Sequence, residues 1–323
     1  DGTLDIIRWS RPQQDGPALR ALAVLRHWRL EAPYSRRDRE AMAVLLLKDL
    51  DFVLHHWDRP SYDLWEDNID RHYHTQLVQH AALLEGAVWA ESHGQHGRAG
   101  HYRRAAALLA ERLDALWSPD EDLYRSRAGS GFSHPKQPDI AVILAVIQAR
   151  LPGGRHSVLD DRVHATLLQL EDVFAADYAI NRSREPGLGR AMGRFRGDLY
   201  FSGGAYYFAT LGTAEFYYRL AAALRRPEAA EAAAEAAEAD GALLRRALRE
   251  AGPASGADRA ALVRALIGKG DAIMATVRKY TPASGALSEQ FDQTTGAQTS
   301  AKDLAWSYAA FITAFDARRQ ALA

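Results

Sequence analysis

The stretch DGPALRALAVLRHWRLE, residues 15–31, shows the pattern that recurs through the chain. Its large apolar side chains return at every third position, which is the spacing of one face of an α-helix. These side chains are Leu19, Leu22, Leu25 and Trp28. Asp15 followed by Pro17 is typical of a helix start, with the acid as N-cap and the proline in the first turn. We therefore expect a helix over this stretch.

The rest of the chain is also predicted to be helical. The further segments with helical spacing are 36–57, 72–93, 98–116, 137–150, 157–175, 203–224, 227–250, 257–279 and 300–318. Three serines, each followed three residues later by an aspartate, resemble capping boxes in which Asp replaces the usual Glu. They are Ser35 with Asp38, Ser255 with Asp258, and Ser300 with Asp303. The Ala- and Glu-rich tract 227–241 is predicted to be an exposed helix, because it consists of strong helix formers.

The order of these segments predicts the fold class. No run of alternating polar and apolar residues typical of strands appears. Helices joined by alternately short and long loops predict stacked antiparallel pairs, arranged as a solenoid or as a closed α/α toroid. The segments are too dissimilar for a TPR or HEAT array. We expect an all-α protein in which residues 1–323 form one domain, because no linker-like stretch divides the chain.

Composition excludes several classes of protein. The chain has 323 residues, of which 47% are hydrophobic, and this is enough to bury a large core. Its formal net charge of −1 argues against nucleic acid or an anionic membrane surface as a partner. No cysteine is present, so disulfides and thiolate zinc sites are excluded. No run approaches the ~20 apolar residues of a transmembrane helix. The chain begins at Asp1 rather than Met, so we expect a mature form or a fragment; its compartment stays open, with a secreted or periplasmic one favoured.

The predicted loops hold the candidate chemistry, as loops on rigid scaffolds often do. YDLWEDN, residues 62–68, contains Glu66, and a second loop contains Glu289. Two carboxyls from distant loops are what glycoside hydrolysis requires, one protonated and one ionised. Trp65 can shield Glu66 from water and Asp67 adds a negative charge nearby, and both effects favour the protonated form. Taken singly, however, each glutamate is better interpreted as an ordinary surface residue.

A third candidate stretch is MGRFRGDLYFSGGAYYFAT, residues 192–210. Arg194 and Arg196 could hold sugar hydroxyls. Three tyrosines could line a pocket: Tyr200, Tyr206 and Tyr207. The alternative interpretation is a surface loop with a glycine turn at Gly203 and Gly204.

The histidines do not indicate a metal site. His72, His74 and His80 are not spaced to lie on one helical face as i and i+4 ligands, and no carboxylate completes a known ligand pattern. We expect neither a metal nor a cofactor.

Four stretches in order along the chain closely resemble the motifs of family 15 glycoside hydrolases, the glucoamylases. They are RWSRPQQDGPALRA (8–21), YDLWED (62–67), GRFRGDLYFSGGAYYFATLGTAEFYYRLA (193–221) and GALSEQFDQTTGAQTSAKDLAWSYAAFITA (285–314). The resemblance implies an (α/α)6 toroid with a pocket at one end. It also implies release of single glucose units from the non-reducing ends of α-1,4 glucans such as starch or maltodextrins, with inversion to β-glucose.

The same resemblance assigns roles to individual residues. Glu66 resembles the general acid, and Glu289 the general base that activates water. An inverting mechanism places two such carboxyls about 6.5–9.5 Å apart. Ser300 resembles a serine that hydrogen-bonds the base, and Arg194 an arginine that hydrogen-bonds glucose hydroxyls. The other residues expected to bind substrate are Trp9, Tyr62, Leu64, Trp65, Asp67, Tyr200, Tyr206, Gln290 and Trp306.

Departures from the family pattern leave the linkage open. Asp67 is one methylene shorter than the glutamate common in the family, and Arg196 and Gly197 replace a Pro-Glu pair. Tyr206 stands where a tryptophan is common. Relatives that prefer α-1,6 glucans such as dextran or isomaltose, or trehalose, share the two glutamates, so they remain alternatives.

Members of the family also have roughly three helices before the position of Trp9. The helical segments of this chain fit the nine or so helices that follow. We therefore expect an upstream segment or a second chain to complete the toroid. A non-catalytic glucan-binding or scaffold protein is the alternative from another class. A helical-repeat interaction protein would require the motif matches to be accidental.

Overall fold

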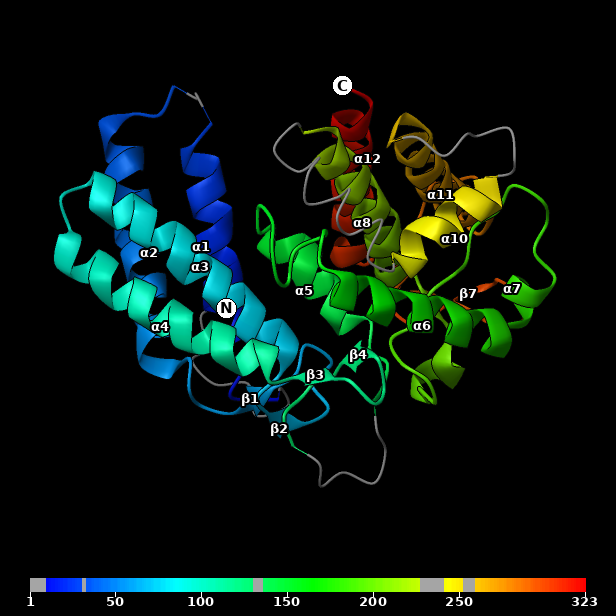
Figure 1. Cartoon of the computed structure of the whole chain (residues 1–323), viewed down its shortest axis with the longest axis horizontal. Helices are drawn as coiled ribbons and strands as arrows, with labels where there is room; N and C mark the ends of the chain where they lie inside the picture. The colour runs from blue at the N-terminus through cyan, green and yellow to red at the C-terminus, as the bar shows by residue number, and fades with distance from the viewer. Residues whose placement is uncertain (1–9, 31–32, 130–135, 227–240, 252–258) are drawn as a thin grey trace. The chain divides into compact units, whose positions relative to one another are not determined.

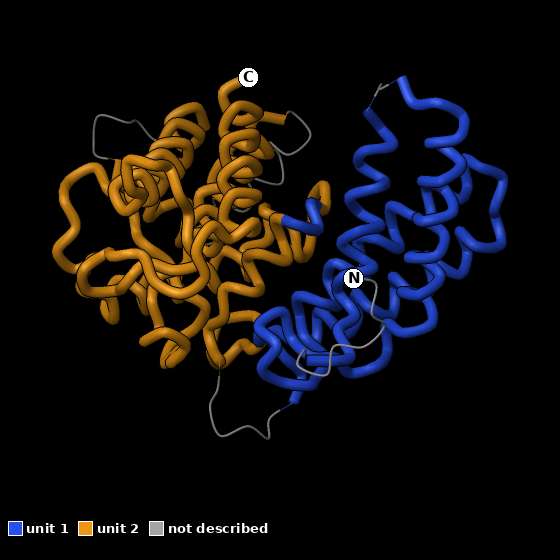
Figure 2. The backbone as a smooth tube through the Cα atoms, turned by 180° about the vertical axis from the view of Figure 1, so that it is seen from behind, with its two compact units in different colours: residues 1–117, 125–133, 148–150 blue, residues 118–124, 134–147, 151–323 orange. Residues whose placement is uncertain are grey.

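The computed structural model describes residues 10–30, 33–129, 136–226, 241–251 and 259–323. The chain divides into two compact units, shown in Figure 2. Unit 1 comprises residues 1–117, 125–133 and 148–150, and unit 2 comprises residues 118–124, 134–147 and 151–323. The single domain expected over 1–323 stays a prediction, and each unit is described by itself.

Unit 1 consists of long helices and a short hairpin (Figure 1). Its elements are α1 (Asp15–Trp28), α2 (Arg36–His56), β1 (Ser61–Tyr62), β2 (Ile69–Asp70), α3 (Tyr73–Ser92) and α4 (His96–Asp114), and β3 (Trp117–Ser118) lies at its border. Helix α3 packs against α1 and α4 and buries side chains all round its first three turns. A helix covered on several sides has no solvent-facing polar stripe, and the polar side chains Thr75, Gln76 and Gln79 of these turns are themselves buried.

The helix starts in unit 1 test two of the predicted caps. Helix α2 begins with a complete capping box, in which Asp38 N–H donates to Ser35 Oγ at 3.1 Å and Ser35 N–H donates to Asp38 Oδ2 at 3.2 Å, so this prediction is confirmed. The predicted N-cap Asp15 is wrong by one position, because the helix already includes Asp15 and Gln14 precedes it. In the first turn Asp15 still lies near the positive end of the helix dipole. The candidate box at 255–258 lies outside the described residues.

The third predicted capping box, at Ser300 and Asp303, is wrong. Helix α12 begins at Ala305, two residues after the aspartate. Ser300 Oγ instead donates to the Glu289 carboxylate, and Asp303 Oδ1 accepts from Tyr308 Oη at 2.7 Å. Partners other than those of a capping box therefore hold both polar side chains.

Unit 2 holds the remaining helices (Figure 1). They are α5 (Ala141–Ala149, most of it in this unit), α6 (Asp161–Asp177), α7 (Ala179–Arg182), the 3-10 turn η1 (Tyr200–Gly203), α8 (Tyr207–Arg225), α10 (Ala242–Ala251), α11 (Arg259–Lys279) and α12 (Ala305–Leu322). Helix α8 packs against both α11 and α12 and is buried along nearly its whole length. Helix α7 was not predicted from the sequence, and most of the tract 227–241 lies outside the described residues.

Short strands in unit 2 form a feature that the sequence did not predict. They are β4 (Leu123–Tyr124), β5 (Ala205–Tyr206), β6 (Gln290–Phe291) and β7 (Gln298–Thr299). The last three form an antiparallel sheet in the order β5-β6-β7. Strands of two residues are too short for a polar and apolar alternation to appear in the sequence. In the part of the chain that is described, no helix has both the length and the apolar character needed to span a bilayer.

Candidate active site

The predicted acid of unit 1 lies at the tip of the β1–β2 hairpin, whose loop is closed by Asp63. The buried Asp63 carboxylate accepts the N–H groups of Asp67 at 2.7 Å and Asn68 at 3.4 Å through Oδ1. Asp63 N–H donates to the carbonyl of Asn68 at 3.0 Å. A buried carboxylate that binds backbone N–H groups fixes the loop in one shape.

Glu66 itself sits in an uncommon backbone conformation, with φ of 62°. Its N–H donates to the carbonyl of Asp63 at 3.0 Å, and its own carbonyl accepts from Ser10 Oγ at 2.9 Å. Such a conformation costs on the order of 1–3 kcal/mol in a residue with a side chain, and it is found most often at functional sites. Contacts on both sides of the peptide therefore hold Glu66 in place.

The neighbours of Glu66 differ in exposure. Trp65 is buried and Glu66 is exposed, so the expected shielding of the carboxyl by the indole is not seen within the hairpin. The left-handed turn at Glu66 sends the two side chains into different surroundings. Asp67 is exposed as well, whereas Tyr62 and Leu64 are half-buried. Trp9 lies outside the described residues.

The predicted base, Glu289, immediately precedes strand β6 in unit 2. Its N–H donates to the carbonyl of Ala301 at 2.7 Å, and its carbonyl accepts from Tyr207 N–H at 3.2 Å. Ser300 Oγ donates to Glu289 Oε2, from a backbone with φ of 62°. The glutamate is half-buried. Backbone contacts on both sides and a hydroxyl donor thus orient this carboxylate.

Strand pairing brings two further predicted residues next to Glu289. Tyr206 pairs with Gln290 across strands β5 and β6, and both are buried. Gln290 Nε2 donates to the carbonyl of Tyr200 at 3.4 Å. Burial raises the pKa of the Tyr206 hydroxyl well above its ordinary value; Arg194 opposes this shift. The hydroxyl therefore stays protonated and can donate a hydrogen bond.

Arg194 is held by Asp198, a residue that the sequence reading did not assign to the site. Nε and Nη2 of Arg194 donate to the two carboxylate oxygens of Asp198 at 2.7 and 2.6 Å. The guanidinium carbon lies 5.3 Å from the ring centroid of Tyr200 and 5.4 Å from that of Tyr206. The spacing of four residues within GRFRGD is the signal that could have revealed this pair.

The remaining predicted side chains of this region lie on its periphery. Trp306 stacks on Phe208 at 3.8 Å between ring centroids, with an interplanar angle of 1°. Tyr200 is half-exposed, and its N–H donates to Asp198 Oδ1 at 3.0 Å. Arg196 is exposed and pairs with Asp177 at 3.3 Å. Unit 2 therefore gathers Glu289, Ser300, Gln290, Tyr206, Tyr200 and Arg194 around strands β5–β7, with Trp306 on the adjoining helix α12.

Replacing Asp198 with asparagine is expected to lower the free energy of unfolding of unit 2 by roughly 3–5 kcal/mol, because the buried Arg194 cation would lose its carboxylate. The two side chains are only 9% and 4% exposed. The midpoint of urea unfolding measures the change. Glu185→Gln is the matched control, because that carboxylate is 68% exposed in its pair with Lys279. Equal midpoints for the two variants would contradict the prediction.

The histidines have protein partners. His72 Nε2 lies 3.0 Å from the carbonyl of Asn68, and His74 Nε2 lies 2.8 Å from Gln148 Oε1. His80 Nδ1 lies 2.8 Å from the carbonyl of Ala106. Across the described ranges, no group of three or more metal-ligating side chains is placed to hold an ion.

His80 is expected to make the protein less stable as the pH falls. Burial lowers its pKa below the ordinary 6.5, although the hydrogen bond to Ala106 opposes this shift. The unfolded chain therefore binds the proton more readily, and stability declines as the pH drops from about 7 through 6.5 towards the lower folded pKa. His80→Gln should show a smaller fall in Tm between about pH 7.5 and 5.5. The exposed His101→Gln is the control, and an unchanged slope in His80→Gln would contradict the assignment.

Comparison with known proteins identifies the class to which this arrangement belongs. The model of the family described as "Glycosyl hydrolases family 15" matches residues 6–316. The chain belongs to this family, and the family predicted from the four sequence motifs is confirmed.

Individual relatives are glucoamylases. The glucoamylase of Blastobotrys adeninivorans is 31% identical over 97% of this chain and 54% of its own length. Glucoamylase 1 of Rhizopus oryzae is 29% identical over 95% of this chain and 52% of its own length. The chain thus spans about half the length of these relatives.

Solved structures agree with this grouping. The family 15 glucoamylase from Hypocrea jecorina superposes with a TM-score of 0.81 at 26% identity, over 97% of this chain and 53% of that one. The Saccharomycopsis fibuligera glucoamylase has a similar fold, with a TM-score of 0.80 at 23% identity over 98% of this chain and 72% of that one. The predicted all-α, (α/α)6 fold class is confirmed.

Proposed function

We propose that this chain carries the catalytic residues of an inverting, exo-acting α-glucosidase that releases β-D-glucose from the non-reducing ends of α-1,4 glucans. The observation that carries the proposal is the Glu289 carboxylate, which accepts a hydrogen bond from Ser300 beside a short sheet. A carboxylate oriented in this way is suited to take a proton from an attacking water. Membership of family 15 supports the same reaction class.

Glu289 acts as the general base in this proposal. Ser300 occupies Oε2, which leaves Oε1 to accept the proton of water. Backbone hydrogen bonds from Glu289 to Ala301 and from Tyr207 to Glu289 fix the position of the main chain that carries this carboxylate. The proton moves from water to the carboxylate while the water oxygen attacks the anomeric carbon from the face opposite the leaving group.

Glu66 acts as the general acid and protonates the oxygen of the leaving sugar. Asp63 and Ser10 support this role by holding the hairpin tip around it. In an inverting reaction both carboxyl groups act on the same glycosidic bond, and the two groups lie about 6.5–9.5 Å from each other. A crystal structure with bound glucose measures that separation.

The remaining residues bind the sugar, and no cofactor takes part. Arg194, oriented by Asp198, hydrogen-bonds glucose hydroxyls. Aromatic rings pack against the apolar C–H faces of the sugar. The proposed substrate-binding set is Trp9, Tyr62, Leu64, Trp65, Asp67, Arg194, Tyr200, Tyr206, Gln290, Ser300 and Trp306.

We further propose that polypeptide beyond this chain, either upstream or in a second chain, contributes to the active enzyme. Helix α12 supports this idea because several large apolar side chains on it are exposed. Phe311 is 42% exposed, Ile312 65% and Phe315 51%. Contiguous apolar surface of this kind is usually covered by another element. The relatives, about twice as long, contain sequence that could cover it.

The test is turnover of three disaccharides by the longest natural polypeptide that contains this chain. Maltose, isomaltose and trehalose report α-1,4, α-1,6 and α,α-1,1 cleavage, and NMR follows the anomer released first. An initial β-glucose signal from maltose above the equilibrium share that its reducing-end sugar supplies supports the proposal. Faster cleavage of isomaltose or trehalose would reassign the linkage. An initial α-glucose signal from maltose above the equilibrium share of the reducing-end sugar would overturn the inverting mechanism. Glucan binding without turnover would favour a scaffold.

A further inference from the structure

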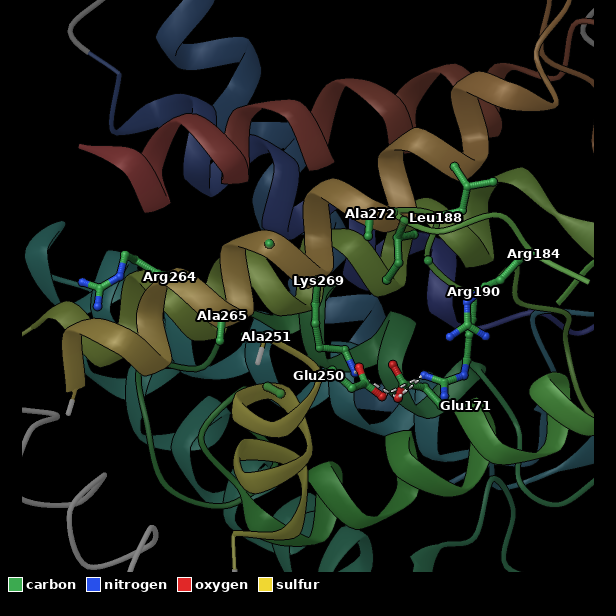
Figure 3. Close-up of a pocket in the computed structure, with 15 residues that line it drawn as sticks. Glu171, Arg184, Leu188, Arg190, Glu250, Ala251, Arg264, Ala265, Lys269 and Ala272 are labelled. Atoms are coloured by element: carbon green, nitrogen blue, oxygen red, sulfur yellow. Dashed lines mark hydrogen bonds and ion pairs between the residues drawn. The ribbon is translucent and has the colours of Figure 1, made fainter. Parts of the chain in front are cut away.

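Unit 2 contains a pocket of about 710 Å³ that none of the proposed catalytic or sugar-binding residues lines. It lies among α6, the loop after α7, α10 and α11 (Figure 3). This volume is within the range of sites that bind small molecules. One part of the wall is apolar, and another part carries several charged side chains.

Two carboxylates and a lysine balance one another inside the pocket. Glu171, whose side chain is only 2% exposed, lies 3.2 Å from Lys269 Nζ and accepts from Tyr217 Oη at 2.6 Å. Lys269 Nζ also lies 3.1 Å from Glu250. Burial would raise the pKa of Glu250, but Lys269 and the neighbouring arginines together hold it below its ordinary value. Glu250 is therefore ionised, and the lysine is engaged by both carboxyl groups.

Among the described residues, the carboxylate partners of Arg190 lie at one nitrogen, Nη1. Nη1 lies 3.3 Å from Glu171 and 3.5 Å from Glu250. Nε is buried and has no hydrogen-bond acceptor within the described part of the chain. A guanidinium presents five N–H donors in a fixed fork, so a buried Nε–H without an acceptor loses its hydration and gains nothing in return. Arg190 lines the pocket and its side chain is 15% exposed, so an acceptor from outside the protein can reach the guanidinium.

A second guanidinium lies on the same side of the pocket. Arg184 and Arg190 both line the pocket, and in the view of Figure 3 both appear on one side of it, with Arg264 on the other. Arg184 makes a long hydrogen bond of 3.4 Å from Nη1 to the carbonyl of Asn181, and among the described residues no carboxylate pairs with it. Two guanidiniums that line one pocket carry like charges, and an anion bound there would give each of them a charge-assisted bond.

The apolar part of the wall is a loop held against α11. Gly189 N–H donates to the carbonyl of Ala272 at 2.7 Å, and Thr276 Oγ1 donates to the carbonyl of Gly189 at 2.8 Å. A Cβ at Gly189 would lie 2.6 Å from the backbone nitrogen of Ile273, so only glycine permits this close approach of the loop to α11. Leu188 and Ile273 then line the pocket beside the charged groups.

We propose that this pocket binds a small organic anion, a carboxylate or a phosphate ester, whose anionic group lies between Arg184 and Arg190. Its carbon skeleton packs against Leu188, Ala272 and Ile273. No aromatic side chain is among the lining residues of this pocket in the described structure, so a sugar ring finds no stacking surface there. The site is thus distinct in chemistry from the proposed glucose pocket.

Isothermal titration of the 323-residue chain with inorganic phosphate, citrate and glucose 1-phosphate at constant ionic strength tests the proposal. Saturable binding of at least one probe is expected, and the order of affinities tells a phosphate site from a carboxylate site. Arg184→Gln should weaken binding by about tenfold or more, since one charge-assisted hydrogen-bonding group is lost. This variant should fold normally, because Arg184 is exposed. Arg184→Lys keeps the charge but not the fork and should bind with intermediate affinity.

Arg249→Gln is the matched control, because Arg249 is an exposed arginine on α10 that does not line the pocket. It should bind the probes as the parent chain does. Equal weakening in Arg184→Gln and Arg249→Gln would reduce the effect to net charge and overturn the site. Absence of saturable binding of all three probes up to about 10 mM would also overturn it. Displacement of the anion by maltose would place it in the glucose pocket instead.

Discussion

Glu289→Gln is expected to lower kcat for maltose hydrolysis by about 10²–10⁴-fold, because glutamine cannot take the proton of the attacking water. The substitution keeps the shape of the side chain and an oxygen that can accept from Ser300 Oγ. KM should change little, since the lost interaction is made with the water in the transition state rather than with the bound sugar. Initial rates and NMR detection of released β-glucose measure the effect in the longest natural polypeptide that contains the chain.

The control for this experiment is Glu185→Gln, which removes an exposed carboxylate that is paired with Lys279 in the same unit. It should retain the parental kcat. A circular dichroism spectrum equal to that of the parent protein shows that Glu289→Gln has folded. Folded Glu289→Gln with near-parental turnover would remove this residue from the role of base.

Glu66→Gln is expected to reduce kcat on maltose by a similar factor of about 10²–10⁴, but to reduce it far less on α-glucosyl fluoride. A sugar leaving group must be protonated as the bond breaks, whereas fluoride leaves readily without a proton. Glu289→Gln should lose both activities, because water attack is needed in either case. The ratio of the two rates in each variant therefore separates the acid from the base.

Asp67→Asn is the matched control for the hairpin, because Asp67 is the adjacent exposed carboxylate in the same loop. It should alter KM more than kcat if it contacts the second sugar. If Glu66→Gln lowers kcat equally on maltose and on α-glucosyl fluoride, the substitution disturbs the hairpin rather than the proton transfer. Hydrogen exchange of the Asp67 and Asn68 amides, which Asp63 binds, reports on that disturbance directly.

Local sequence patterns predicted the helices well where the deciding interactions are local. The apolar spacing of residues 15–28 and the capping box at Ser35 and Asp38 involve neighbours within one or two turns. Both appear in the structure, and so does the helix over 259–279. The family was also predictable, because four motifs in order along the chain are specific without any knowledge of their contacts.

Patterns failed where a distant residue competes for the same group. Ser300 and Asp303 have the spacing of a capping box, but Ser300 donates to Glu289 and the helix starts later. The left-handed backbone at Glu66 depends on contacts with Asp63 and Ser10. In each case such contacts outweigh a local preference worth about 1–3 kcal/mol.

The sequence by itself determined the all-α class, the family and the candidate carboxylates Glu66 and Glu289, because periodicity and motif order are properties of the chain alone. Only the tertiary structure decided what surrounds these groups. It set Ser300 against Glu289 and brought Arg184 and Arg190 to one pocket. Burial and charge pairing depend on which distant residues meet, and no spacing along the chain records that.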